Sequence, residues 1–208
     1  HAGWHEDVPA IDLEPQTEFT EIMWAKPTEI LSRWRSYELK VAPPVVTLLM
    51  EVERTLERHE RNMDLAADEI SSRLPGRRSI LFAHGVEVIP IKTATLPPAD
   101  HTNAYMVGDP DGDFVLVDPA VRMREDMETL ATAIERHEGN LLAVIFTHSH
   151  GDHLADIGLL REAVDAPIWG SEFTSQSVPC ERILKDGDAL QLGNQQWKVL
   201  ITPGHHPG

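Results

Sequence analysis

A chain of 208 residues has room for one domain of ordinary size and part of a second. Its 18 Lys and Arg residues are outnumbered by 34 Asp and Glu residues, and the resulting net charge of −16 disfavours non-specific binding to nucleic acid. Hydrophobic residues make up 41% of the chain, enough for a buried core, but no run reaches the roughly 20 apolar residues that cross a bilayer.

The start of the chain and the single cysteine bear on where the protein works. The first residues form neither the basic nor the apolar segment of a signal peptide. Cys180 is alone, so it has no partner for an internal disulfide, as is typical of a reducing compartment. We therefore predict a cytoplasmic protein. Because the first residue is not Met, we interpret the chain as a piece of a longer protein, cut at both ends.

Helices are expected in the N-terminal part of the chain. Pro27 stands where a helix can begin, and the residues at 42–44 can end that helix and start another. The apolar residues of the second helix fall on one predicted face, which consists of Val45, Leu48, Leu49, Val52 and Leu56. A third short helix fits the charged stretch 57–78. We place a domain boundary near residues 60–78, with a helical segment over 1–75 and a second domain over 79–208.

Strands and helices alternate after this boundary. The expected strands are 85–96, 103–107, 114–118, 141–146 and 166–169, followed by a hairpin over 189–201. The expected helices are one whose core-facing residues are Met123, Met127, Leu130 and Ile134, and one over 155–164. Pro90 favours an edge position for the first strand, and the continuous apolar run 141–146 predicts burial on both faces. The pattern as a whole predicts an α/β fold.

The stretch IFTHSHGDHL, residues 145–154, is dense in groups that bind metals. Side chains at i and i+2 of an extended segment point the same way, so His148 and His150 can converge on one cation. A glycine turn then places Asp152 and His153 at the start of the next helix, where they can serve a second cation. Imidazoles combined with a carboxylate favour zinc or iron over calcium.

A second loop, TPGHHPG, follows the last predicted strand. Its Pro-Gly bend can present His205 as the third histidine of the first cation. Adjacent residues point apart, so His206 is expected to face solvent or substrate. Two cations about 3.5–4 Å apart would form a hydrolytic pair.

These residues resemble the motifs of the metallo-β-lactamase superfamily. Its H-x-H-x-D-H motif appears as His148, His150, Asp152 and His153. Its T-P-G-H motif appears at 202–205, where His206 replaces the usual small hydroxyl residue that follows. The segments 103–107 and 115–120 are similar to the opening hairpin of the family. The resemblance covers roughly residues 80–208.

The resemblance implies a fold and a set of ligands. The fold would be the N-terminal part of an αββα sandwich, preceded by the helical segment. One metal would be held by His148, His150 and His205, the other by Asp152 and His153, with Asp118 supporting the ligands. A strand-end turn former remains the alternative for Asp118. The family's bridging Asp and last His are expected beyond residue 208, so we expect this chain by itself to be inactive or weakly active.

The implied function is a hydrolase with two Zn2+ ions, in which metal-bound hydroxide attacks a thioester, ester or phosphodiester. Asp152 would be catalytic by orienting the water. The pattern is nearest to the glyoxalase II-like and β-lactamase-like-2 branches, so a small-molecule substrate is expected first and RNA second, with no membrane partner. The substrate-contact candidates are His101, Asn103 and His206. The alternative is an oxygenase similar to the persulfide dioxygenases, with one Fe2+ ion.

The N-terminal residues 24–56 resemble the C-terminal end of a nudix-type domain. Some bacterial proteins join such a domain to a metallo-β-lactamase domain. The Glu-rich nudix box is absent from this chain, so no nudix chemistry is expected from it. A simple helical extension remains the alternative.

Overall fold

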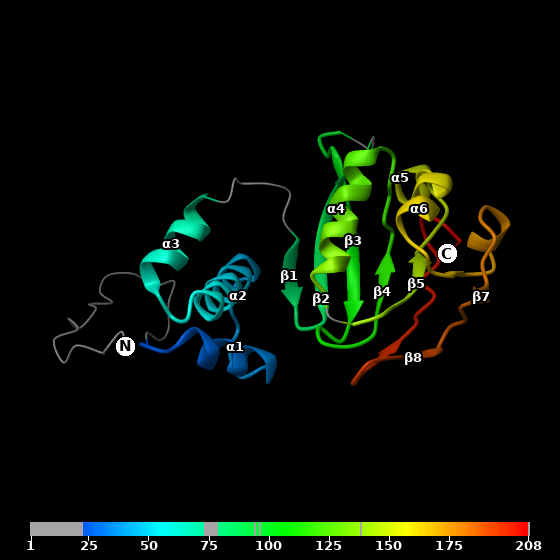
Figure 1. The fold of residues 1–208 in the computed structure, drawn as a ribbon. Helices are drawn as coiled ribbons and strands as arrows, with labels where there is room; N and C mark the ends of the chain where they lie inside the picture. Colours follow the sequence, from blue (N-terminus) through cyan, green and yellow to red (C-terminus); the bar gives the residue numbers. More distant parts are fainter. Residues whose placement is uncertain (1–22, 73–78, 94, 96, 138, 208) are drawn as a thin grey trace. The chain divides into compact units, whose positions relative to one another are not determined.

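The computed structural model describes residues 23–72, 79–93, 95, 97–137 and 139–207 (Figure 1). The chain divides into two compact units, His1–Leu74 and Pro75–Gly208. Among the described residues, none of the helices combines the length and the apolar character that crossing a membrane requires.

The described part of the first unit consists of helices, each of which packs against the next one along the chain. They are α1 (Pro27–Arg35), α2 (Pro43–Arg58) and α3 (Met63–Ser72). A proline in the first turn begins both α1 and α2, where its fixed φ suits the helix and its missing N–H costs no hydrogen bond. Helix α2 contacts both α1 and α3. Its most buried apolar side chain is Val46, which is 1% exposed.

The predicted apolar face of α2 is partly wrong. Val45 and Leu48 are 45% and 53% exposed, whereas Val46, Glu53 and Leu56 are buried. Glu53, seven positions after Val46, lies on nearly the same side of the helix, and Leu56 lies between that side and the predicted one, so the buried side is turned by less than one residue from the predicted one. Because α2 packs against both of its neighbours, these contacts and not the apolar pattern alone decide which face is buried.

The second unit is built on a seven-stranded sheet in the order β1 to β7. The strands are β1 (Ile80–Ala83), β2 (Val86–Lys92), β3 (His101–Gly108), β4 (Phe114–Val117), β5 (Leu141–Phe146), β6 (Ile168–Gly170) and β7 (Arg182–Ile183). Pairs from β1 to β4 are antiparallel, and pairs from β4 to β7 are parallel. The other elements are α4 (Arg124–Glu135), α5 (Gly151–Leu154), α6 (Ile157–Ala163), the 3-10 helix η1 (Thr174–Gln176), and the hairpin β8 (Ala189–Leu192) and β9 (Gln195–Lys198).

Two hydrophobic clusters lie on opposite faces of this sheet. Phe114 and Leu116 of β4 pack in the cluster that α4 and α6 cover, while Val115 between them packs in the cluster that β8 covers. This alternation is the period of two expected for a strand buried on both faces. Strand β5 divides in the same way, so its predicted burial is confirmed. Figure 1 shows α4 lying along one face of the sheet.

Several other sequence-based expectations need correction. Strand β2 is not at an edge, because the short strand β1, which was not predicted, pairs with it. Pro90 pairs with Asn103 of β3 on one side. On its other side no residue of β1 lies opposite it among the described residues, because the pairing of β1 with β2 ends at Val88. Met123 is 45% exposed because it precedes α4, so its predicted place in the core is wrong. The mixed sheet and its covering helices confirm the predicted α/β class.

Candidate metal centre

The carboxyl ends of β4 and β5 lie side by side because these strands are parallel neighbours. Asp118 directly follows β4, and its backbone N–H donates to the carbonyl of Ile145 at 3.0 Å. The histidine-rich segment begins two residues after β5 ends. Ligand sites of open α/β sheets form at this edge, where loops from adjacent strands meet.

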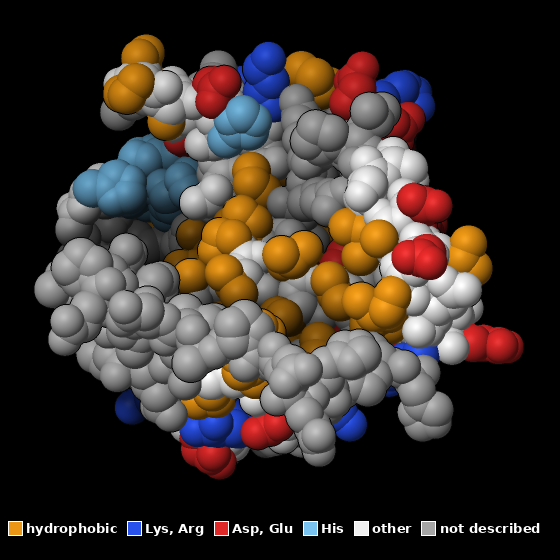
Figure 2. Space-filling model, turned by 90° about the vertical axis from the view of Figure 1, so that its left-hand side faces the viewer, with side chains coloured by type: hydrophobic (Ala, Val, Ile, Leu, Met, Phe, Trp, Pro, Cys, Tyr) orange, Lys and Arg blue, Asp and Glu red, His pale blue; other side chains and the backbone are white. Residues whose placement is uncertain are grey.

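Three histidine side chains from two distant loops converge here. His148 Nε2 lies 3.1 Å from His150 Nδ1, and that atom lies 3.2 Å from His205 Nε2. One ligand atom from each residue can be chosen so that all lie within 4.8 Å of one another. The space-filling view in Figure 2 likewise shows histidine side chains gathered in one place.

The separations between these nitrogens fit a shared cation. Two nitrogens that each lie about 2.0–2.1 Å from a tetrahedral zinc ion are about 3.3 Å apart. The contacts of His150 with His148 and His205 are close to that separation. One ring N–H can donate to only one of these two neighbours. Hydrogen bonds between the rings therefore cannot pair all three nitrogens at once. A cation that receives a lone pair from each of the three rings can do so.

A second group of potential ligands surrounds the buried carboxylate of Asp118, which is 4% exposed. Asp118 Oδ1 accepts the backbone N–H of Thr147 at 2.8 Å. Its Oδ2 accepts the Thr147 hydroxyl at 2.6 Å and His153 Nδ1–H at 2.9 Å. Asp118, His148 and His153 can present ligand atoms within 4.8 Å of one another.

These bonds assign the ring protons of two histidines. An ionised carboxylate only accepts, so the Thr147 hydroxyl must donate to Asp118. The same hydroxyl oxygen lies 3.0 Å from His148 Nδ1 and is free only to accept there, so Nδ1 carries the proton. His153 likewise donates through Nδ1. Nε2 of both His148 and His153 is then left with a free lone pair, as a metal ligand requires.

Local electrostatics keep His148 neutral. Burial, followed by the neighbouring histidines, lowers the pKa of His148 to about 4 despite the opposing effect of Asp118. The hydrogen bond to Asp118 instead raises the pKa of His153. His148 is 7% exposed and therefore presents an uncharged ring at neutral pH.

Asp152 is held by a residue from another loop. Thr95 Oγ1 donates to Asp152 Oδ2 at 2.9 Å. Burial acts to raise the pKa of Asp152, but the bond from Thr95, a backbone N–H and the nearby His153 and His150 together lower it. Asp152 belongs to neither of the two close groups found among the described residues.

The three predicted substrate contacts differ in their surroundings. His206 reaches the cluster, since its Nε2 lies 3.1 Å from Ser149 Oγ and its ring centroid lies 4.8 Å from that of His150. His101 begins β3 and pairs with Asp100 at 2.6 Å, and Asn103 is an exposed residue of the same strand.

Sequence reasoning missed three residues that support the site. Thr147 could have been noticed because it directly precedes the first histidine. Thr95 lies between β2 and β3, and Arg122, whose Nη2 donates to the carbonyl of Gly151 at 2.8 Å, lies between β4 and α4. Nothing in the spacing of the sequence connects these last two with the histidine segment.

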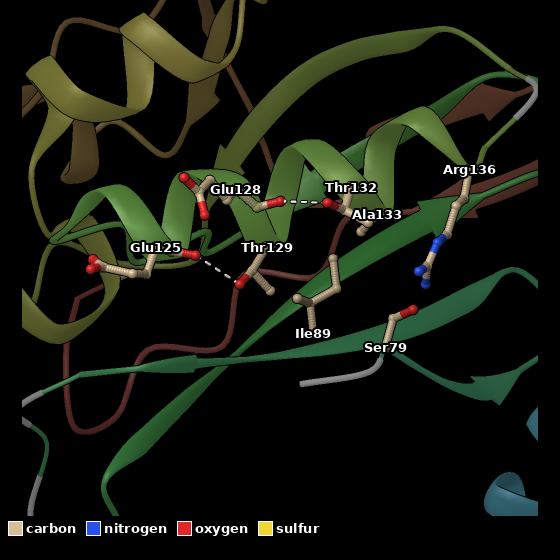
Figure 3. A pocket seen from close by; sticks show the side chains of 8 residues that line it. All are labelled: Ser79, Ile89, Glu125, Glu128, Thr129, Thr132, Ala133 and Arg136. Carbon is tan, nitrogen blue, oxygen red and sulfur yellow. Dashed lines mark hydrogen bonds between the residues drawn. The ribbon is translucent and has the colours of Figure 1, made fainter. Parts of the chain in front are cut away.

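A cavity of about 440 Å³ lies elsewhere in the second unit (Figure 3). Its lining residues are Ser79, Ile89, Glu125, Glu128, Thr129, Thr132, Ala133 and Arg136. The hydroxyls of Thr129 and Thr132 donate to backbone carbonyls within α4. This cavity includes none of the candidate metal ligands.

The sheet and the histidines at its strand ends define a metal-binding α/β domain. Residues 97–208 match the profile of the family described as the metallo-beta-lactamase superfamily, over more than half of the chain. The chain therefore belongs to the metallo-β-lactamase superfamily, and the resemblance seen in the sequence is confirmed.

Individual relatives share modest sequence identity with this chain. The chain is 31% identical over 122 residues to a hydroxyacylglutathione hydrolase of Cereibacter sphaeroides, covering 58% of this chain and 46% of that protein. It is 27% identical over 137 residues to an uncharacterized protein of Aquifex aeolicus, covering 57% and 62% respectively. A metallo-beta-lactamase family protein of Thermus thermophilus has a TM-score of 0.46 and 21% identity, covering 60% of this chain and 54% of that one. The chain spans about half the length of the curated relatives it matches. The nudix-type resemblance of the first helices stays a prediction.

Proposed function

We propose that this chain forms part of a metal-dependent hydrolase that holds two zinc ions. The convergence of His148, His150 and His205 carries the proposal, because three imidazole nitrogens at these separations suit zinc. His148 and His150 follow β5 of the seven-stranded sheet, and His205 follows β9 of the separate two-stranded hairpin, so the ligands come from two distant loops. Asp152 and His153 would hold the second ion.

The residues of the chain divide the work at this site. Asp118 and Thr147 fix the ring protons, so that His148 and His153 present Nε2 without a proton. Asp152 would hold and orient a water molecule through its carboxylate in addition to binding metal. A bound zinc ion would lower the pKa of its coordinated water to about 7 and would polarise the substrate oxygen.

A thioester is the proposed substrate class. Several relatives are named hydroxyacylglutathione hydrolases, and a hydroxyacylglutathione is a thioester of a small hydroxy acid. The other substrates expected from the sequence, an ester or an RNA phosphodiester, gain no such support, and neither does the iron oxygenase. The cytoplasmic location stays a prediction.

Metal content and thioester cleavage test this function together. The full chain is prepared metal-free, titrated with zinc or ferrous iron, and assayed for thiol release from a hydroxyacylglutathione. We expect zinc to bind and to support slow hydrolysis, and His150→Ala to lose both. Thr129→Val, which removes a hydroxyl bonded only within α4, is the control. Zinc binding that survives His150→Ala contradicts the proposal, and so does zinc-dependent thiol release that His150→Ala leaves unchanged.

A further inference from the structure

Thr95 makes a contact that joins two segments far apart in the sequence. Its hydroxyl lies 2.9 Å from Asp152 Oδ2, across 57 residues of chain. An ionised carboxylate can only accept, so the Thr95 hydroxyl donates. Hydrogen bonds to ionised groups are about twice as strong as those between neutral groups. The contact therefore fixes a side chain of the metal-binding segment from outside that segment.

The segment that carries Thr95 is tied to the sheet at its base. It connects β2 with β3. Lys92, the last residue of β2, is paired with His101, the first residue of β3. The backbone N–H of Thr93 donates to the carbonyl of Asp100 at 3.0 Å. The hydroxyls of Thr93 and Thr102 lie 2.7 Å apart, and both residues are buried. The two ends of the segment are thus closed by bonds close to Thr95.

The backbone next to Asp152 is held by a second contact. It is the second residue of α5, which follows directly on His150. Arg122 Nη2 donates to the carbonyl of Gly151, the first residue of that helix. Arg122 therefore restrains the backbone beside Asp152, while Thr95 restrains its carboxylate. Two loops that carry no proposed ligand hold one ligand between them.

We propose that Thr95 is a positioning residue that holds the carboxylate of Asp152 for the second cation. The inference rests on the proposed function, in which Asp152 is a ligand of that cation. The hydroxyl engages one lone-pair direction of Oδ2 and restricts rotation of the carboxylate before metal arrives. A ligand ordered in advance loses less conformational entropy on binding, so the second ion binds more tightly.

Metal binding to variants of the full chain tests this inference. Cobalt(II) is titrated into the metal-free chain, since its visible spectrum reports the ligands of each ion, and zinc competition gives the affinities. Thr95→Val keeps the size of the side chain but removes the donor, and we expect the second ion to bind about 10- to 100-fold more weakly. Thr95→Ser restores the hydroxyl and should restore the affinity and the spectrum. Thr129→Val should change neither.

Asp152→Asn separates failure of the inference from failure of the proposed function. If this variant loses the second ion while Thr95→Val binds it normally, the positioning role is overturned and the ligand role stands. If Thr95→Ser and Thr95→Val are equally weak, shape and not the hydrogen bond matters, and the inference is also overturned. If Asp152→Asn binds two ions as well as the original chain does, the ligand assignment in the proposed function fails and takes the inference with it.

Discussion

Replacing Asp118 with Asn should weaken metal binding at the second cation site, because it should move one proton on the ring of His153. The side-chain amide keeps the size of the carboxylate but turns one acceptor into a donor. Its oxygen must remain opposite the Thr147 backbone N–H, which can only donate. The amide nitrogen then takes the place of Oδ2, where it faces His153 Nδ1. His153 must accept there, so its proton moves to Nε2 and blocks the lone pair meant for metal.

The cost can be worked from the bonds of Asp118. Oδ2 receives two charge-assisted hydrogen bonds, one from Thr147 and one from His153. Bonds to charged groups contribute about 1.5–3 kcal/mol each and neutral ones about 0.5–1.5, so the variant should lose about 2 kcal/mol of unfolding free energy. Loss of a supporting partner behind a ligand lowers metal affinity by about 10- to 100-fold.

Urea unfolding of the metal-free chain measures the first effect, and zinc competition measures the second. Nitrogen NMR of the imidazole rings reports directly which nitrogen of His153 carries the proton. Asp109→Asn is the matched control, because Asp109 is also buried but accepts only the backbone N–H groups of Asp111 and Asn194. It should lose stability and keep zinc affinity. An Asp118→Asn chain with unchanged affinity and with His153 still protonated at Nδ1 would refute the reasoning.

Four further outcomes are expected. His205→Ala removes an exposed ligand and should weaken binding of the first zinc ion at least about tenfold, which competition titration measures. The same change should alter the unfolding free energy of the metal-free chain by no more than about 0.5 kcal/mol, which urea unfolding measures. Burial, above all, lowers the pKa of His148 to about 4 from 6.5, so between these values only the unfolded chain takes up a proton there. Stability of the metal-free chain should therefore fall by about 2 kcal/mol from this residue between about pH 7.5 and about pH 5, a slope that His148→Gln should lack in urea unfolding. Phe146→Ala, which empties a buried position of β5, should cost about 3–5 kcal/mol in the same assay, and a loss below about 1 kcal/mol would contradict the packing. Zinc at about 100 times its dissociation constant should stabilise the chain by about 2.7 kcal/mol, which thermal melting with and without a chelator measures.

The parts of the fold that could be predicted are those that local chemistry determines. Residues 141–146 form an unbroken apolar run, and only a strand with two covered faces buries such a run in this setting. The hairpin of β8 and β9 turns at Gly193, whose φ of +58° suits glycine. The spacing of His148 and His150 predicted that their side chains could converge, and their ring centroids lie 4.7 Å apart.

The parts that could not be predicted depend on packing partners. In α2, Val45 and Val46 are identical in chemistry, and only contacts with neighbouring helices decide that Val46 is buried. Strand β1 is four residues long and has no regular alternation of exposed and buried residues, so it leaves little trace in the sequence. The bond of Thr95 to Asp152 exists only because the sheet brings two loops together.

The central claim is that His148, His150 and His205 bind one zinc ion. Anomalous X-ray diffraction from crystals of the zinc-loaded chain locates that ion directly. We predict a zinc peak within about 2.0–2.1 Å of one nitrogen from each of the three rings. A zinc-loaded crystal with no peak between these rings, or with zinc bound only at other residues, would contradict the account.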